Sequence, residues 1–316
     1  MHSFPLVRLL ITLFMAFLGM SAFAQDYPNK VVRIVTSEAG GSGDSIARLV
    51  AQGLTKGLGQ QVIVDSRGIL ASDAIAKAPP DGYSLLFYGS GAWISPLVRK
   101  TSWDPEKDFA PIMLVVDAVS ILVVHPSVPA KSVQELIALA KAKPGEINFA
   151  SSATGSATHL AGELFKSMTG VNIVHIPYKG ISVAYNDLIA GRVQMIFGTS
   201  GSVSSNVKAG KMRAIAIANG KPSALLPGLP TIASTVPGFD AGIPYAMFAP
   251  ARTPTAIINR LNEETGRALR QADISDRLLK LEVEVIASTP AQLAEKVRTD
   301  RTQFGKIIRD AGIQED

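Results

Sequence analysis

The chain has 316 residues, a formal net charge of +5 and no cysteine. This small charge surplus contains no basic run, which argues against nucleic-acid binding, and the lack of cysteine excludes disulfides, thiolate metal sites and thiol nucleophiles. Hydrophobic residues make up 47% and charged residues 18% of the chain, which favours large folded cores over disorder. The length predicts two domains.

The first 24 residues predict a secretory signal that is cleaved before Gln25. Arg8 precedes an apolar run, and residues 22–24 have the small-x-small pattern that signal peptidase accepts. The run is shorter than the roughly 20 residues that a membrane span needs. We therefore expect an exported chain, and the absence of cysteine favours a bacterial periplasm over a disulfide-rich secreted fold.

Strands and helices alternate through the first part of the chain. Residues 31–35 are rich in β-branched side chains and predict a buried strand, which leads through a glycine loop into an amphipathic helix at 45–58. The elements expected next are a strand at 61–65, a short helix at 71–77, a turn at 79–82, a strand at 83–88 and an extended segment at 115–124.

The alternation restarts after residue 132. Strands are expected at 147–150, 171–176, 193–197 and 213–217, and helices at 132–143, 157–168, 182–190 and 202–209. A tract rich in Pro and Gly at 222–244 precedes three helices near 254–271, 274–281 and 290–311. This order predicts two α/β lobes with parallel or mixed sheets, and a ligand cleft where the carboxyl ends of their strands face each other.

Residues 147–180 contain the most informative local pattern, because a strand runs through a hydroxyl-rich loop into a helix. A helix start carries unpaired N–H groups and about half a positive charge, so a carboxylate fits there. The simpler interpretation is that Ser156 caps the helix and the other hydroxyls face water. The hydroxyl residues and the glycine of this loop are Ser151, Ser152, Thr154, Gly155, Ser156 and Thr158.

Three catalytic or cofactor interpretations have weaker support. The glycine loop at 40–44 lacks the last glycine of a dinucleotide fingerprint and has no Walker lysine. Ser152 or Ser156 with His159 as base would make an exported hydrolase, but no third triad member is recognisable, so we favour a hydrogen-bonding or polar helix role for His159. His159 and His175 are not at metal-ligand spacing, so no metal site is expected.

Eight segments together resemble the solute receptors of tripartite tricarboxylate transporters, the Bug proteins. The similarity runs from Tyr27 almost to Ile313. The segments are YPNKVVRIV, GGSGDSIARLVAQGLTKGLGQQVIVDSR, AKAPPDGYSLL, DFAPI, VVHPSVPAKSVQELIALAKAKPG, SSATGSATHLAGELFKSMTG, IVHIPYKG and LPGLPTIA.

This resemblance implies a periplasmic binding protein type II fold, with two α/β lobes that close around a small carboxylate about a hinge of crossing strands. The first lobe would comprise residues 25–124 and 246–316, and the second lobe residues 125–245, with the hinge near 124–127 and 244–247. It also implies no catalysis, no cofactor, and a monomer that docks on a membrane permease. A receptor that serves a membrane sensor would have the same residues.

The resemblance also implies a ligand site shared by both lobes. Tyr178 and Lys179 would close the cleft with Gly180, and Lys179 either pairs with a ligand carboxylate or remains a solvated surface residue. The other implied site residues are Gly40, Gly41 and Ser90 in the first lobe and Ser151, Ser152, Ser156, Thr158, His159 and Thr199 in the second.

Two departures from the family pattern fall in the first lobe. Thr36, Ser37 and Glu38 replace the usual Pro, aromatic residue and Pro, which adds Ser37 and Glu38 to the predicted site. The segment 65–71 lacks the usual glycine-rich wall. Because Glu38 would repel a carboxylate, we hypothesise an amino acid, or an aromatic or apolar monocarboxylate, in place of a simple tricarboxylate. The alternative is a weak or orphan receptor.

Overall fold

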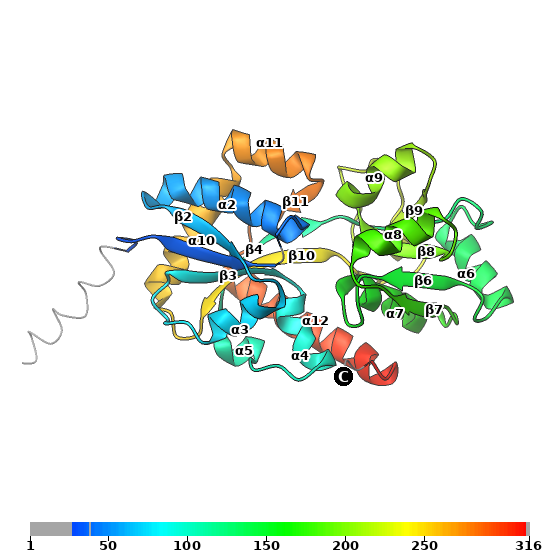
Figure 1. Ribbon diagram of the computed structural model, residues 1–316, viewed down its shortest axis with the longest axis horizontal. Helices are drawn as coiled ribbons and strands as arrows, with labels where there is room; N and C mark the ends of the chain where they lie inside the picture. The colour runs from blue at the N-terminus through cyan, green and yellow to red at the C-terminus, as the bar shows by residue number, and fades with distance from the viewer. Residues whose placement is uncertain (1–26, 38, 314–316) are drawn as a thin grey trace, which may run out of the picture.

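The computed structural model describes residues 27–37 and 39–313, so the predicted signal segment and Glu38 lie outside the described residues. Two α/β lobes stand side by side, each built on one sheet with helices on its faces (Figure 1). No helix in the described ranges combines the length and apolarity that a membrane span requires. The predicted two-lobed mixed α/β fold is confirmed.

The first lobe is built on a six-stranded mixed sheet in the order β11-β4-β10-β3-β1-β2. β1 runs parallel to β2 and β3, whereas β10 is antiparallel to β3 and β4. The strands are β1 (Val32–Thr36), β2 (Val62–Ser66), β3 (Ser84–Gly89), β4 (Phe109–Ala118), β10 (Ile243–Pro250) and β11 (Val283–Val285). The helical elements of this lobe are α2 (Ser42–Leu58), the 3-10 turn η2 (Gly68–Leu70), α3 (Ala71–Ala76), α4 (Gly91–Val98), α5 (Pro105–Asp108), α10 (Thr255–Leu269) and α11 (Ala272–Lys280).

The second lobe is built on a five-stranded sheet in the order β7-β6-β8-β5-β9. β6 is parallel to β7 and β8, and β5 is antiparallel to β8 and β9. The strands are β5 (Ser120–Val124), β6 (Asn148–Ser151), β7 (Val174–Pro177), β8 (Met195–Thr199) and β9 (Arg213–Ile217). The helical elements are α6 (Val133–Ala142), α7 (Ala157–Thr169), α8 (Ile181–Ile189), α9 (Ser200–Lys208) and the 3-10 turn η3 (Ile232–Ser234).

The chain crosses between the lobes at positions that differ from the expected boundaries. Only Val119 separates β4 of the first sheet from β5 of the second, and β10 has already entered the first sheet at Ile243. The expected boundary after residue 124 is therefore one strand too late. The apolar run 115–124 looks like a single extended segment, and its sequence does not reveal that it changes sheets at Val119.

Helix α12 (Pro290–Asp310) ties the two lobes together. It begins against the first lobe and runs beneath both lobes toward the second (Figure 1). Leu293 and Val297 belong to the core next to α3 and α4, whereas Ile307 belongs to the core of the second lobe. The C-terminal helix is therefore shared by the lobes, although the expected boundaries assign it wholly to the first lobe.

Candidate functional site

A cleft of about 490 Å³ lies between the lobes, which is within the size range of small-molecule sites. Its first-lobe wall comes from the carboxyl ends of β1 and β3, the start of α2, the length of α4, and β10. Its second-lobe wall comes from the loop after β6 and the starts of α7, α8 and α9. Both walls therefore follow the rule that ligands bind at the carboxyl ends of strands.

Helix α4 lies lengthwise along the first-lobe wall. Its residues Gly91, Ile94, Ser95 and Val98 all line the cleft, and their spacing places them on one face of a helix. The opposite face is anchored in the core through Trp93, whose indole Nε1–H donates to Asp300 of α12 at 3.0 Å. Arg99 follows the last turn of α4 and also lines the cleft.

The hydroxyl-rich loop of the second lobe is held by its own hydrogen bonds. The Ser152 N–H donates to Thr158 Oγ1 at 3.0 Å, and Ser156 caps α7 by accepting the His159 N–H at 3.3 Å. Gly155 has a φ of +73°, and a Cβ on it would lie 2.7 Å from Cγ1 of Val98 in the opposite lobe. A glycine is therefore required where the loop meets α4.

His159 and His175 support this loop from behind the cleft. His159 Nδ1 accepts the Gly155 N–H at 2.9 Å, and the two imidazole rings stack with centroids 3.7 Å apart. His175 Nε2 lies 2.7 Å from the Ser151 hydroxyl, which in turn donates to the Ala153 carbonyl. These contacts fix the path of the loop without placing either ring in the cleft.

Both histidines are neutral at physiological pH. Burial, together with the charge of Lys166 and the neighbouring His175, lowers the pKa of His159 to about 3. Burial and Lys166 lower the pKa of His175 to about 4. The contact of 3.8 Å between His159 Nε2 and Glu163 is therefore not an ion pair, and Glu163 pairs with Lys166 at 2.8 Å.

Five helices direct their N-terminal ends at the cleft, two from the first lobe and three from the second. The residues at their starts that line it are Ser42, Gly91, Ala157, Ile181 and Ser202. The first turns of α4, α7, α8 and α9 contain no acidic residue. The first turn of α2 contains Asp44, which is paired with Arg48 at 3.0 Å. The cleft is thus bordered by partial positive charges.

Tyrosine hydroxyls add hydrogen-bond donors to both walls. Burial raises the pKa of Tyr185 in the second lobe and of Tyr245 in the first to about 12, so both phenols keep their protons. Tyr245 stacks on Phe87 with centroids 6.0 Å apart, which holds its ring beside Gly43 and Gly89. Tyr88 also lines the cleft.

The structure places most of the predicted ligand-binding residues around the cleft, but not all of them. Seven line it directly: Ser37, Gly41, Ser90, Ser152, Ser156, Thr158 and Thr199. Gly40 borders an adjoining pocket of about 180 Å³ between the starts of α2 and α9. Ser151 and His159 are buried behind the loop, with exposed fractions of 0% and 4%. Glu38 lies outside the described residues.

Tyr178 and Lys179 lie away from the cleft. The Tyr178 hydroxyl donates to Asp187 at 2.8 Å, its backbone N–H donates to the Ser151 carbonyl, and Lys179 is exposed. In the shortened segment after β2, the single 3-10 turn η2 leads directly into α3, and Leu70 is 64% exposed and does not line the cleft.

The serine–histidine arrangement of the hydrolase alternative is not formed at the cleft. His159 Nδ1 is occupied by a backbone N–H, and the Ser156 hydroxyl donates to the Ala153 carbonyl at 2.7 Å. Ser151 does contact a histidine ring, but it is completely buried. The residues that the structure describes also hold no group of three or more His, Asp or Glu positioned to bind a metal ion.

Sequence reasoning missed the residues on α4 and the tyrosines. Pro96 lies inside α4, and the mixture of aromatic, apolar and polar residues in this helix has no clear amphipathic period. The strand that ends at Gly89, followed by Ser90 and Gly91, could have indicated a helix start, because the other site helices also follow strand ends in this way.

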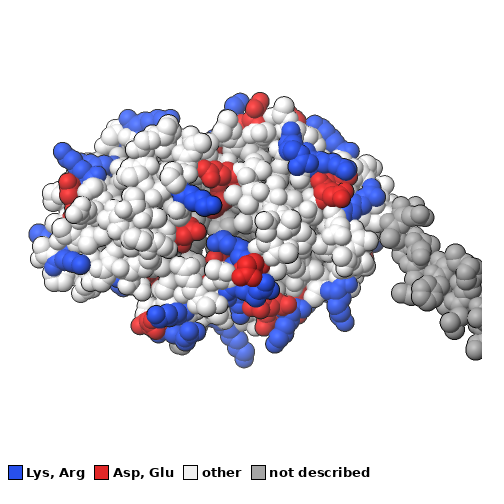
Figure 2. Space-filling view, turned by 180° about the vertical axis from the view of Figure 1, so that it is seen from behind, with Lys and Arg blue, Asp and Glu red and all other residues white. Residues whose placement is uncertain are grey.

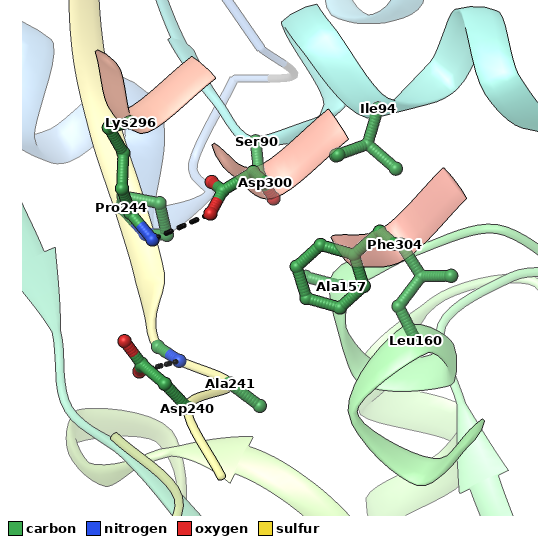
Figure 3. Close-up of a pocket in the computed structure, with 11 residues that line it drawn as sticks. Ser90, Ile94, Ala157, Leu160, Asp240, Ala241, Pro244, Lys296, Asp300 and Phe304 are labelled. Carbon is green, nitrogen blue, oxygen red and sulfur yellow. Dashed lines mark hydrogen bonds and ion pairs between the residues drawn. The ribbon is translucent and has the colours of Figure 1, made fainter. Parts of the chain in front are cut away.

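A small cavity behind the cleft contains charged groups at the hinge (Figure 3). Lys296 Nζ pairs with Asp300 at 2.8 Å, and Asp240, next to the second crossing, faces them. Burial and the charge of Asp240 raise the pKa of Asp117, which lies next to the first crossing, to about 7. A Cβ on Gly242 would lie 2.7 Å from Asp117 Oδ2. The two crossing segments and α12 are therefore packed around one polar cluster.

On the face opposite to the one seen in Figure 1, the charged side chains form no large patch of a single sign. Lys and Arg are interspersed with Asp and Glu over both lobes there, and side chains of both signs surround the hollow between them (Figure 2). The lining of the cleft differs from this mixed surface. Among the described residues that line it, Arg99 is the only one with a formal charge.

Comparison with known proteins gives one consistent result. Residues 46–313 match the model of the tripartite tricarboxylate transporter family receptor. Protein BugT of Bordetella pertussis is 34% identical over 315 residues, covering 96% of this chain and 97% of that protein. The solved structure of R. palustris Rpa4515 with adipate is 33% identical, with a TM-score of 0.79 over 92% of this chain and 99% of that one.

MatC from Rhodopseudomonas palustris, solved with bound malate, is 28% identical and has a TM-score of 0.75 over 89% of this chain and 100% of that one. Both structures are of carboxylate-bound proteins with the two-lobed fold found here. The family is one of receptors, and the match extends over both lobes and over the part of the cleft lining that follows residue 46. The chain belongs to the tripartite tricarboxylate transporter receptor family.

Proposed function

We propose that this protein captures a small carboxylate between its lobes and delivers it to a tripartite tricarboxylate-type permease. The observation that carries this proposal is the convergence of five helix N-termini from both lobes on one cleft. Each helix start offers unpaired N–H groups and about half a positive charge, so a carboxylate placed there is stabilised without any catalytic group. The adipate and malate bound by relatives are in keeping with this chemistry.

Capture proceeds by closure of the lobes around the ligand. A carboxylate that first meets one wall gains further N–H and hydroxyl donors when the other wall approaches, so the ligand favours the closed arrangement. The crossings at Val119 and before Ile243 are the segments about which the lobes would turn. Micromolar affinity needs about 8 kcal/mol, which several charge-assisted hydrogen bonds and apolar burial can supply.

The same proposal covers location and partners. The protein works in the periplasm after removal of residues 1–24, as a monomer, and its ligand-bound form docks on the membrane permease of the transporter. The contacts that bind the ligand come from Ser37, Gly41, Ser90, Ser152, Ser156, Thr158 and Thr199, while Ser151 and His159 position the second-lobe loop. Binding requires no cofactor, and the ligand leaves unchanged.

Differential scanning fluorimetry and calorimetry with matched ligands test this proposal. Mono-, di- and tricarboxylates are compared with the corresponding uncharged amides. At a hundred times its Kd, a carboxylate ligand adds about 2.7 kcal/mol of stability and raises Tm by roughly 5–10 °C, whereas its amide has no effect. Equal effects of acid and amide, no response to any carboxylate, or chemical conversion of the ligand would contradict the proposal.

A further inference from the structure

We propose that Asp117 is a proton-controlled switch at the hinge, and that protonation of its carboxyl group favours the arrangement in which the two lobes touch. This inference concerns the joint between the lobes and does not depend on which ligand the cleft binds. It rests on charged side chains contributed by both lobes, on a buried oxygen without a hydrogen-bond partner, and on the contacts between the lobes.

The carboxyl groups of Asp117 and Asp240 belong to different lobes. Asp117 lies near the end of β4 and pairs with Glu284 of β11 in the first sheet. Asp240 follows Phe239 in the core of the second lobe, and its Oδ1 accepts the Gly220 N–H at 3.0 Å. A movement of one lobe against the other therefore changes the distance between these two carboxyl groups.

The two carboxyl groups meet at Gly242, in the second crossing. A Cβ on Gly242 would lie 2.7 and 2.8 Å from the two carboxyl oxygens of Asp117, and Asp240 Oδ1 accepts the Gly242 N–H at 3.4 Å. Asn219, which follows β9, donates to Asp117 Oδ2 at 3.1 Å and accepts the Ser120 N–H at 2.7 Å, on the far side of the first crossing. Two negative charges this close destabilise each other unless one group takes up a proton.

The cluster carries more negative than positive charge. The charged groups around Asp117 are Asp240, Glu284 of β11 and Lys296 of α12. Lys296 is already paired with Asp300 at 2.8 Å. Figure 3 shows Asp240 facing this pair across a cavity of about 20 Å³, which has room for one water molecule. The ammonium group of Lys296 therefore cannot balance all the carboxylates around it.

One oxygen of Asp117 is ready to receive a proton. Its Oδ1 atom is buried and has no hydrogen-bond partner among the described residues. Burial, together with the charge of Asp240, raises the pKa of Asp117 from its usual 3.8 to about 7. A proton on Oδ1 removes the negative charge and turns an unpaired acceptor into a donor. In the arrangement seen here, the group therefore changes its charge near neutral pH.

The lobes touch each other at two places in this arrangement. Gly155 lies against Val98 of α4, and the Ser204 hydroxyl of α9 donates to the Glu282 carboxylate at 2.9 Å. When the lobes separate, water reaches Asp117 and its pKa falls toward the usual value. Protonated Asp117 therefore favours the touching arrangement below pH 7, and this preference is lost as the pH rises through 7.

Distances between spin labels on the two lobes, measured by double electron–electron resonance without ligand, test this switch. The chain has no cysteine, so the labels attach only at Ser275→Cys on α11 and Ser205→Cys on α9, which are both exposed positions. The labels are closest when the lobes touch. With Asp117 intact, the ratio of touching to separated molecules should rise about tenfold or more between pH 8 and pH 5.5.

Three further variants assign the response. Asp117→Asn should keep a high touching fraction at every pH, because an amide resembles the protonated carboxyl group and does not titrate. Asp240→Asn should move the midpoint of the response to lower pH, because one like charge is removed. Asp310→Asn, at the exposed end of α12, is the matched control and should respond as the parent does. Thermal melts establish that each variant is folded.

Three results would overturn the inference: an equal ratio at pH 8 and pH 5.5 with Asp117 intact, the same pH response in Asp117→Asn, or a midpoint that Asp240→Asn does not move. The proposed capture of a carboxylate would stand in each case, because the measurement uses no ligand.

Discussion

His159 illustrates how a single side chain shapes the site from behind the cleft. It accepts the Gly155 N–H, stacks on His175, and stays neutral because burial opposes its charge. In the unfolded chain a histidine has a pKa of about 6.5, so between that pH and about 3 the unfolded state binds a proton that the folded state does not. The stability that depends on neutral His159 is thus complete above pH 6.5 and decreases as the pH falls.

We predict that His159→Asn reduces the acid sensitivity of the fold. Asparagine can keep an acceptor near the Gly155 N–H but does not titrate. A histidine that stays neutral in the folded state lowers the free energy of unfolding by about 1.4 kcal/mol for each pH unit below 6.5. Between pH 7 and pH 5 the wild type should therefore lose about 2 kcal/mol more of its unfolding free energy than the variant. Urea denaturation at both pH values measures this difference, and equal losses would show that His159 is not held neutral.

At this scale the sequence predicts the chemistry of the second-lobe wall better than that of the first. Small hydroxyls next to a helix start have few roles besides capping and binding, and Ser156 caps α7 and lines the cleft. The role of His159 could not be predicted, because it depends on a stacked partner from β7. Arg99, Tyr185 and Tyr245 are ordinary residues in the sequence, and only the folded chain brings them to one cleft.

Among the elements, α7 shows how tightly a site helix is fitted to its sheet. Gly162 lies against the ring of Phe149 on β6, and a Cβ there would overlap the Phe149 Cε2 atom. Phe149 is fully buried and cannot move aside. The start of α7 is therefore positioned by close packing between helix and strand as well as by its cap.

Gly162→Ala should destabilise the protein by roughly 1–2 kcal/mol. Overpacking costs about 1–3 kcal/mol, and a Cβ 2.1 Å from the buried Phe149 ring places this cost at about 2–3 kcal/mol, of which the better helix propensity of alanine returns about 1. Ser167→Ala, an exposed position on the same helix, is the matched control and should change stability by less than about 0.5 kcal/mol. Chemical denaturation compares the two variants, and a Gly162→Ala variant as stable as the wild type would refute this packing argument.

The elements also show where sequence patterns stop being informative. Long amphipathic helices such as α2, α10 and α12 and β-branched strands such as β1 are recognisable because one periodicity governs each of them. Helix α4 is not recognisable because Pro96 and the single aromatic residue Trp93 obscure the period of its apolar residues. The change of sheet at Val119 escapes because both flanking strands are largely buried and apolar. Asp117 and Ser120 lie beside it, but no Pro or Gly marks a break in residues 115–124.

On the scale of the whole molecule, two connections and one helix join the lobes. Both crossings meet α12 at the polar cluster of Asp117, Asp240, Lys296 and Asp300 behind the cleft. Figure 3 shows the last three of these residues. Ser90, Ile94, Ala157 and Leu160 line both the cleft and this cavity. In the closure proposed above, a ligand that draws the two walls together would act on residues that also pack where the lobes are joined.

A crystal structure grown with the tightest-binding carboxylate of the panel tests the central claim most directly. Our account predicts that a carboxylate of the ligand lies within hydrogen-bond distance of backbone N–H groups at the start of α2 or α4 and, from the other lobe, of α7, α8 or α9. A ligand held by one lobe alone, or bound outside the cleft, would contradict the account.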